Sequence, residues 1–239
     1  MTFEYRSGAL CAEQVPLEEI ARRFGTPSYV YSRAAIEARF GEFARALAGH
    51  ASLIAYSVKA NSNLAVLAVL ARLGAGFDIV SGGELARVLA AGGDARKILF
   101  SGVGKTEDEI ARALDAKVLC LNLESEMELH RVAAIAKHLG KRAPIAFRVN
   151  PDVDAKTHPY ISTGLKQSKF GVPYEDAERL YREAAGTWTS GADSASATAT
   201  RHRHRSRSSW TGRWVCSQAG VKRWSSTPGA PSWATPACC

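Results

Sequence analysis

The chain has 239 residues, of which 46% are hydrophobic, and a formal net charge of +8 at pH 7. This is enough apolar material for a globular core, and no run approaches the roughly 20 apolar residues that span a bilayer. Residues 1–6 lack the basic-then-apolar order of a secretory signal, so we expect a cytoplasmic protein with no membrane partner. Five cysteines without a CxxC pair or a regular spacing favour reduced thiols and no metal site.

The positive charge is concentrated near the carboxyl end. Residues 187–239 hold seven of the 31 basic residues and one of the 23 acidic residues. Residues 1–186 are therefore nearly neutral and lack the basic surface of a nucleic-acid-binding domain, so no nucleic-acid partner is expected. The alternating Arg and His residues at 201–205 could contact phosphates or a metal, but a solvated run is the simpler interpretation.

After an amino-terminal segment, residues 1–26, short β-branched runs alternate with helical stretches. The predicted strands are residues 28–31, 53–58, 76–80, 98–101, 118–123 and 145–149. The last five begin 20 to 27 residues apart, which leaves room for one helix and two short loops between neighbours. This pattern is typical of βα units on a parallel sheet, and it defines a domain over residues 27–186.

The stretches between these strands carry helix-start signals. Asn63 can cap a helix over residues 64–73, Ser81 precedes Glu84 by the three residues of a capping box, and Thr106 begins an acidic first turn. Such units form either a (β/α)8 barrel or an open doubly wound sheet, and periodicity alone does not choose between them. No GxGxxG follows the first strand, and residues 102–105 (GVGK) lack the spacing of a phosphate loop, which disfavours a nucleotide-binding sheet.

Lys59 follows the predicted strand that ends at residue 58. Active sites of β/α barrels are assembled at the carboxyl ends of the strands. A lysine in an apolar setting there can form a Schiff base with an aldehyde cofactor. A single strand-end lysine is more often simply solvated, so position alone does not assign a role to Lys59.

Four motifs occur in the order seen in alanine-racemase-fold decarboxylases. They are residues 56–61 (YSVKAN), 76–85 (GFDIVSGGEL), 122–129 (NLESEMEL) and 147–151 (FRVNP). Residues 158–164 (HPYISTG) and 168–171 (SKFG) then resemble the diaminopimelate branch of this family rather than the ornithine or arginine branches. The resemblance covers about residues 15 to 185 and implies a (β/α)8 barrel of the alanine-racemase type, here incomplete with about six strands.

The resemblance implies a pyridoxal 5'-phosphate enzyme with Lys59 as the residue that carries the cofactor. Asp78, Glu84 and Arg148 match positions around the cofactor, and Ser81 is a further candidate. His158 would help to hold the substrate or close a loop over the pocket. Taken singly, each residue also has a structural explanation: a turn or cap for Asp78 and Glu84, an ion pair at the barrel mouth for Arg148, and an exposed loop position for His158.

The implied reaction is the decarboxylation of meso-2,6-diaminopimelate, a small amino acid, to L-lysine. Two alternatives remain open. One is a sister decarboxylase that acts on another basic amino acid, which residues 158–171 argue against. The other is a non-catalytic carrier of pyridoxal phosphate with the same type of barrel, which would need phosphate-binding turns that are not visible in this length of chain.

The resemblance ends at Gly186, where the composition changes abruptly. Residues 187–239 contain all five tryptophans and no Leu, Ile, Phe or Tyr, so we expect a disordered tail. A natural basic tail, a linker and translation in a wrong reading frame are the competing explanations, and the third is favoured. The family's cofactor-stacking histidine, glycine-rich phosphate turns, pyridine-nitrogen acid and partner-subunit cysteine are not recognisable there, which predicts weak cofactor binding, little turnover and impaired formation of the family's homodimer.

Overall fold

The computed structural model describes residues 3–150, 171–189 and 213–217, with side chains for residues 3–150 and 171–185. The strands are β1 (Phe3–Arg6), β2 (Ala9–Ala12), β3 (Val15–Pro16), β4 (Ser52–Ser57), β5 (Gly76–Ile79), β6 (Ile98–Phe100), β7 (Cys120–Leu123), β8 (Ile145–Phe147), β9 (Val149–Asn150), β10 (Val172–Pro173) and β11 (Arg213–Ser217). The α-helices are α1 (Leu17–Phe24), α2 (Arg33–Ala46), α3 (Leu64–Arg72), α4 (Gly82–Ala90), α5 (Glu107–Ala116), α6 (Glu126–His138) and α7 (Tyr174–Thr189). Two short 3₁₀ helices are η1 (Val58–Ala60) and η2 (Ala95–Lys97).

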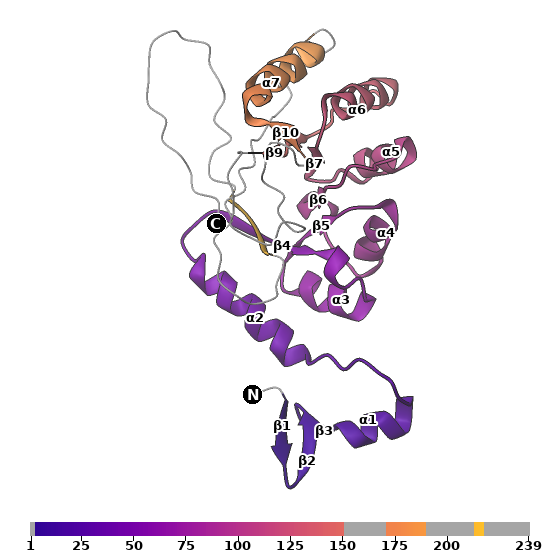
Figure 1. Ribbon diagram of the computed structural model, residues 1–239, viewed down its shortest axis with the longest axis vertical. Coiled ribbons are helices and arrows are strands. Elements are labelled where there is room, and N and C mark those ends of the chain that lie inside the picture. Colours follow the sequence, from indigo (N-terminus) through magenta and orange to yellow (C-terminus); the bar gives the residue numbers. More distant parts are fainter. Residues whose placement is uncertain (1–2, 151–170, 190–212, 218–239) are drawn as a thin grey trace.

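The main sheet has the order β11-β4-β5-β6-β7-β8, and the strands from β4 to β8 are parallel. These five strands follow one another in space as they do in sequence. Because βα crossovers are right-handed, an order without a reversal places every connecting helix on the same face of the sheet. Helices α3 to α6 accordingly lie along one side of the strands (Figure 1). This arrangement is that of a barrel wall and not of a doubly wound sheet.

The hydrophobic core lies between the strands and these helices. Phe77, Ile98, Phe100, Leu121 and Phe147 have no exposed surface, and they pack with the inner faces of the helices. Burial of large apolar side chains of this kind contributes about 1.5 to 3 kcal/mol each. The core therefore fixes the wall from which the functional side chains project.

The helix starts read from the sequence are confirmed, but the capping box expected at Ser81 forms only in half, because the Glu84 carboxylate accepts from the Val80 amide and not from the Ser81 amide. The Asn63 side chain accepts a hydrogen bond from the Ala65 amide, and the Ser81 side chain accepts one from the Glu84 amide. Thr106 and Glu109 form a reciprocal capping box at the start of α5. These contacts satisfy backbone amides that have no partner within their own helices.

Residues 28–31, which were predicted as a strand, form no strand. Tyr29 is 92% exposed and Tyr31 is 54% exposed, so this run has no neighbouring strand against which to bury its side chains. A β-rich sequence without a pairing partner does not form a ladder.

The last predicted strand, residues 145–149, divides at Arg148. The Arg148 amide donates to the Leu123 carbonyl of β7, whereas its carbonyl accepts from the Val172 amide of β10. The chain thus leaves the main sheet at Arg148 and pairs through β9 with β10. Gly171 permits this approach because its φ is +82° and a Cβ there would lie 2.8 Å from the Arg148 carbonyl oxygen.

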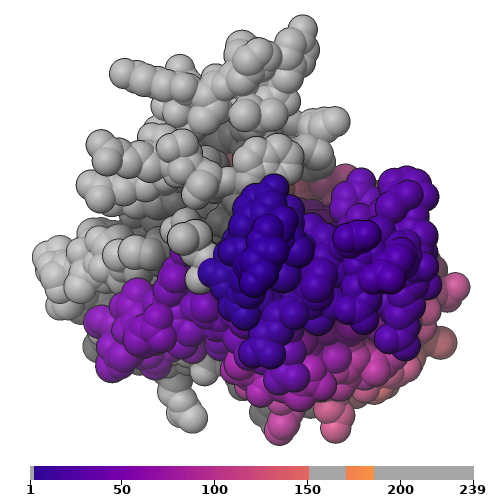
Figure 2. All heavy atoms as spheres, turned by 90° about the horizontal axis from the view of Figure 1, so that it is seen from below, coloured from indigo at the N-terminus to yellow at the C-terminus, as the bar shows by residue number. Residues whose placement is uncertain are grey.

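The amino-terminal residues form a small separate sheet, β1-β2-β3, against which α1 packs. Glu13 links this unit to α2, because its carboxylate accepts hydrogen bonds from the Ser32 hydroxyl and the Ala34 amide. Figure 2 shows the unit in indigo at the surface. Within the described residues, no helix has the length and apolarity needed to cross a bilayer.

The expectation of disorder after residue 186 differs from the structure in two places. Helix α7 continues to Thr189, and β11 pairs antiparallel with β4, with Val215 opposite Ile54. An exposed sheet edge offers unpaired backbone groups to any extended segment, so β11 can pair there without apolar periodicity of its own. The remaining residues of the tail lie outside the described part of the chain, and the division into domains stays a prediction.

Candidate active site

Polar side chains cross the carboxyl ends of the parallel strands on the face turned away from the helices. Asp78 illustrates the arrangement, because its neighbours Phe77 and Ile79 belong to the core on the helix side. Side chains alternate between the two faces of a strand, so Asp78 projects from the opposite face. Five polar residues lie on or just after the ends of β4 to β8, and we call them the polar row: Ser57, Asp78, Ser101, Asn122 and Arg148.

Lys59 lies in the short helix η1, directly after β4. Its side chain is 53% exposed, and Nζ is 4.0 Å from Oδ2 of Asp78. This contact follows from the sheet register, in which Ser57 is paired with Asp78. The two residues that the sequence placed at neighbouring strand ends are thus brought together, with a half-exposed amine beside a buried carboxyl group.

Asp78 is 2% exposed. Its Oδ1 accepts a hydrogen bond of 2.5 Å from the Ser101 hydroxyl, while Oδ2 has no hydrogen-bond partner within the described residues. Burial raises the pKa of the Asp78 carboxyl, and the hydrogen bond from Ser101 and the charge of Lys59 partly oppose this rise. A buried carboxylate oxygen without a partner is costly, so Oδ2 is an acceptor available to a group bound beside Lys59.

Ser81 and Glu84 have structural roles at the start of α4. The Glu84 amide donates to the Ser81 hydroxyl at 3.2 Å, and the Glu84 carboxylate accepts from the Val80 amide at 2.8 Å. Glu84 also acts at a distance, because its negative charge adds to the raised pKa of Asp78. The capping contacts of Ser81 and Glu84 are observed, whereas their place in the cofactor site remains a prediction.

Arg148 lies at the far end of the polar row. Its Nη1 is 3.4 Å from Oε2 of Glu124, and the side chains are 25% and 4% exposed. The positive charge of Arg148 also lowers the pKa of Asp78, so Arg148 and Lys59 both act electrostatically on the same buried carboxyl. The ion pair with Glu124 is the structural alternative that the sequence raised for Arg148, and its place around the cofactor stays a prediction.

Sequence reasoning missed the residues that connect this row. Asn122 Nδ2 donates to the Ser101 hydroxyl at 2.9 Å, and Ser101 donates onward to Asp78. Both follow alternating apolar residues at strand ends, which was the available signal. Lys105, taken only as part of an imperfect phosphate loop, is fully buried and pairs with Glu128 at 2.7 Å.

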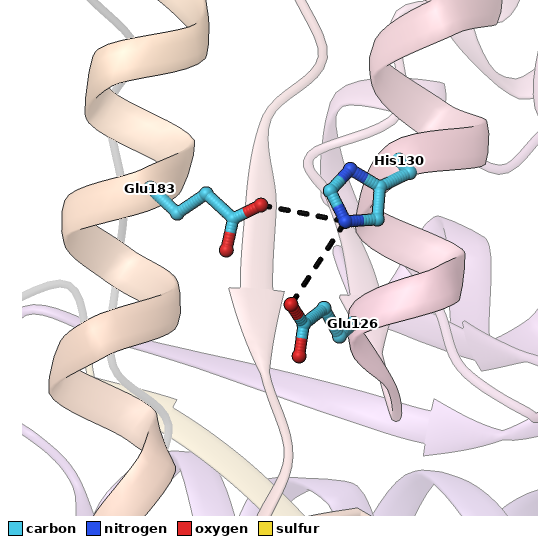
Figure 3. Close-up of side chains that lie close together, drawn as sticks. All are labelled: Glu126, His130 and Glu183. Atoms are coloured by element: carbon cyan, nitrogen blue, oxygen red, sulfur yellow. Dashed lines mark ion pairs between the residues drawn. The ribbon is translucent and has the colours of Figure 1, made fainter.

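Within the described residues, a cluster of possible metal ligands lies between α6 and α7. His130 Nε2 is 3.4 Å from Glu183 and 4.0 Å from Glu126 (Figure 3). Arg179 already pairs with both carboxylates, at 2.8 Å to Glu126 and 3.4 Å to Glu183. This cluster acts as an ionic contact between the two helices.

His158, the predicted substrate or loop residue, lies outside the described residues. The same is true of the surrounding segment, residues 157–164. Its role therefore remains a prediction from the resemblance.

The fold and this strand-end lysine define the chain as part of a β/α-barrel protein with an amine-bearing site at the carboxyl ends of its strands. Residues 33–188 match the family described as pyridoxal-dependent decarboxylase, pyridoxal binding domain. The chain belongs to this family of pyridoxal-dependent decarboxylases.

Within this family, the chain is similar to diaminopimelate decarboxylases. The chain is 62% identical to diaminopimelate decarboxylase of Pseudomonas aeruginosa over 184 residues, which are 77% of this chain and 44% of that protein. It is similar to the crystal structure of diaminopimelate decarboxylase from Helicobacter pylori complexed with L-lysine, with 48% identity, a TM-score of 0.68, and coverage of 70% and 42% of the two chains.

An arginine decarboxylase of Paramecium bursaria Chlorella virus has the same fold at 21% identity and a TM-score of 0.58, with coverage of 72% of this chain and 44% of that one. These neighbours confirm the predicted fold class. The chain spans less than half the length of the relatives it matches.

Proposed function

We propose that this chain carries the cofactor-attachment half of a decarboxylase that converts meso-2,6-diaminopimelate to L-lysine. The observation that carries the proposal is the juxtaposition of Lys59 and Asp78, in which an accessible amine lies 4.0 Å from a buried carboxylate oxygen that has no partner within the described residues. The similarity to diaminopimelate decarboxylases supports the choice of substrate, since the arginine enzyme shares only the fold.

The described residues fit the aldehyde end of pyridoxal phosphate. Lys59 would bind its aldehyde carbon through Nζ, and the unpartnered Oδ2 of Asp78 would accept a hydrogen bond beside that attachment point. Arg148, 25% exposed and ion-paired with Glu124, would contribute positive charge at the other end of the polar row. When bound, pyridoxal phosphate draws off the electron pair left on the substrate α-carbon as carbon dioxide departs.

The chain's own residues would act on the amine and its protons. Lys59 Nζ would give way to the substrate amine and remain beside Asp78 Oδ2, which can accept a proton shared with either amine. Burial raises the pKa of Asp78, which favours its holding such a proton. Cytoplasmic location belongs to the same proposal, whereas formation of the family's homodimer is expected to be impaired in this chain.

The test is the absorbance of the pyridoxal chromophore in the full chain after loading with pyridoxal phosphate. We expect meso-diaminopimelate to change this absorbance at concentrations where L-arginine and L-ornithine do not, with only slow formation of L-lysine because little turnover is expected of this chain. An equal response to all three amino acids would favour the sister-decarboxylase alternative. Cofactor binding without a response to any amino acid would favour the carrier, and no binding would contradict the proposal.

A further inference from the structure

Asp78 is connected to residues on two neighbouring strands by hydrogen bonds whose direction is fixed. Asn122 Nδ2 lies 2.9 Å from the Ser101 hydroxyl oxygen, and that oxygen lies 2.5 Å from Asp78 Oδ1. The other end of the Asn122 amide, Oδ1, is 3.7 Å from the Cys120 thiol, which is a donor. The amide nitrogen of Asn122 is thus the atom that faces Ser101.

An amide nitrogen only donates, and a serine hydroxyl has one proton. Ser101 Oγ accepts from Asn122 and donates its one proton to Asp78 Oδ1. This contact occupies Oδ1 as an acceptor and leaves Oδ2 as the oxygen that faces Lys59, 4.0 Å away. The orientation of the carboxyl group is therefore set from β6 and β7 and not from the lysine side.

We propose that Ser101 and Asn122 are positioning residues that keep Asp78 as a hydrogen-bond acceptor toward Lys59. The proposal rests on the proposed function, because it assigns these residues to the same cofactor-bearing lysine. Neither residue contacts Lys59, so both act through Asp78.

The electrostatics of Asp78 agree with this arrangement. Burial favours the protonated acid, and the Ser101 hydrogen bond is the largest of the effects that oppose it. The charged groups that act on Asp78 are Lys59 and Arg148, which lower its pKa, and Glu84, which raises it. Without Ser101, burial is opposed by charges alone, and Asp78 becomes protonated at a higher pH.

The measurement is the pH titration of the Asp78 carboxyl carbon by ¹³C NMR in the cofactor-free full chain, with the Asp78 signal assigned by its loss in Asp78→Asn. In Ser101→Ala we expect the midpoint to rise by about one to two pH units, since a charge-assisted hydrogen bond is lost. Asn122→Ala should raise it by less, because Ser101 remains. Ser101→Thr keeps the hydroxyl and should restore the original midpoint.

The matched control is Ser52→Ala, since Ser52 lies at the opposite end of β4 and donates only to the His50 carbonyl at 3.3 Å among the described contacts. An unchanged Asp78 midpoint in Ser101→Ala would overturn the proposal. If Ser101→Ala does not fold, the shift in Asn122→Ala decides the question by the same criterion. If the midpoints move as expected but borohydride does not trap pyridoxal phosphate on Lys59 of the unsubstituted chain, the proposed function fails while the hydrogen-bond relay stands.

Discussion

Lys105 and Glu128 form a buried ion pair, with Nζ of the lysine 2.7 Å from Oε1 of the glutamate and side-chain exposures of 0% and 7%. The ammonium group is fully hydrogen-bonded, because it also donates to the carbonyls of Gly102 and Asn122 at 2.7 Å each. The second carboxylate oxygen of Glu128 accepts from the Glu124 amide. The pair therefore fastens the loop after β6 to the end of β7, where two residues of the site are located.

Replacement of Lys105 by alanine should strongly destabilise the chain. It leaves the Glu128 carboxylate buried without its partner, which costs about 3 to 5 kcal/mol. Urea unfolding followed by circular dichroism measures this loss. Lys137→Ala, at an exposed position on α6, is the control and should change stability by less than about 0.5 kcal/mol. Similar midpoints for the two variants would show that the ion pair does not fasten the loop.

The capping box of α5 predicts a stability contribution that depends on pH. The pKa of the Glu109 carboxyl is lowered, first by the hydrogen bond from the Gly82 amide and then by that from the Thr106 amide. A lowered folded-state pKa stabilises the fold above the ordinary value of 4.5, and this stabilisation is lost as the pH falls through the lowered pKa. Glu109→Gln should thus be less stable than the unsubstituted chain at pH 7.

Thermal unfolding of both proteins across the acid range checks this expectation. The difference in melting temperature should shrink as the pH falls below 4.5, the ordinary pKa of the carboxyl. Glu107→Gln changes a neighbouring acid in the same helical turn and serves as the control. A difference for Glu109→Gln that persists unchanged in acid would mean that the charge of Glu109 has no part in the cap.

Tyr181 of α7 packs against Phe147 at the carboxyl end of β8, the last strand of the main sheet. Its hydroxyl accepts a hydrogen bond of 3.1 Å from the Phe147 amide, and the two rings meet edge to face with centroids 5.0 Å apart. Burial raises the pKa of Tyr181 to about 12. Tyr181→Phe keeps the ring but removes the acceptor, so it should cost about 1 to 3 kcal/mol.

Chemical unfolding of Tyr181→Phe gives this cost directly. Tyr174→Phe, at a position that is 61% exposed, makes the same chemical change and should have a much smaller effect. Equal stability of the two variants would mean that the Phe147 amide finds another partner when the hydroxyl is absent.

Much of the barrel wall could be predicted from the sequence because its signals are local. Strands β4 to β8 follow from short β-branched runs at regular spacing, and the caps at Asn63, Ser81 and Thr106 follow from helix-start rules. The prediction of a strand at residues 28–31 was wrong because a strand also needs a neighbouring strand, which a local pattern does not provide.

The candidate site could be predicted only where its signals are local. Motifs located Lys59, Asp78 and Arg148, whereas the link from Asn122 through Ser101 joins strand ends 21 residues apart and depends on the register of β6 and β7. The burial of Lys105 could not be predicted either. A lysine in a glycine-containing loop is normally solvated, and the local sequence does not show that Glu128 on α6 lies close enough to pair with it.

The most direct test of the account is the site at which pyridoxal phosphate becomes attached. The full chain is incubated with the cofactor and reduced with borohydride, and its peptides are mapped by mass spectrometry. We expect the phosphopyridoxyl label on the peptide that contains Lys59, its loss in Lys59→Arg and its retention in Lys137→Arg. Label distributed evenly over exposed lysines, or undiminished labelling of Lys59→Arg, would contradict the assignment of Lys59 as the cofactor-bearing residue.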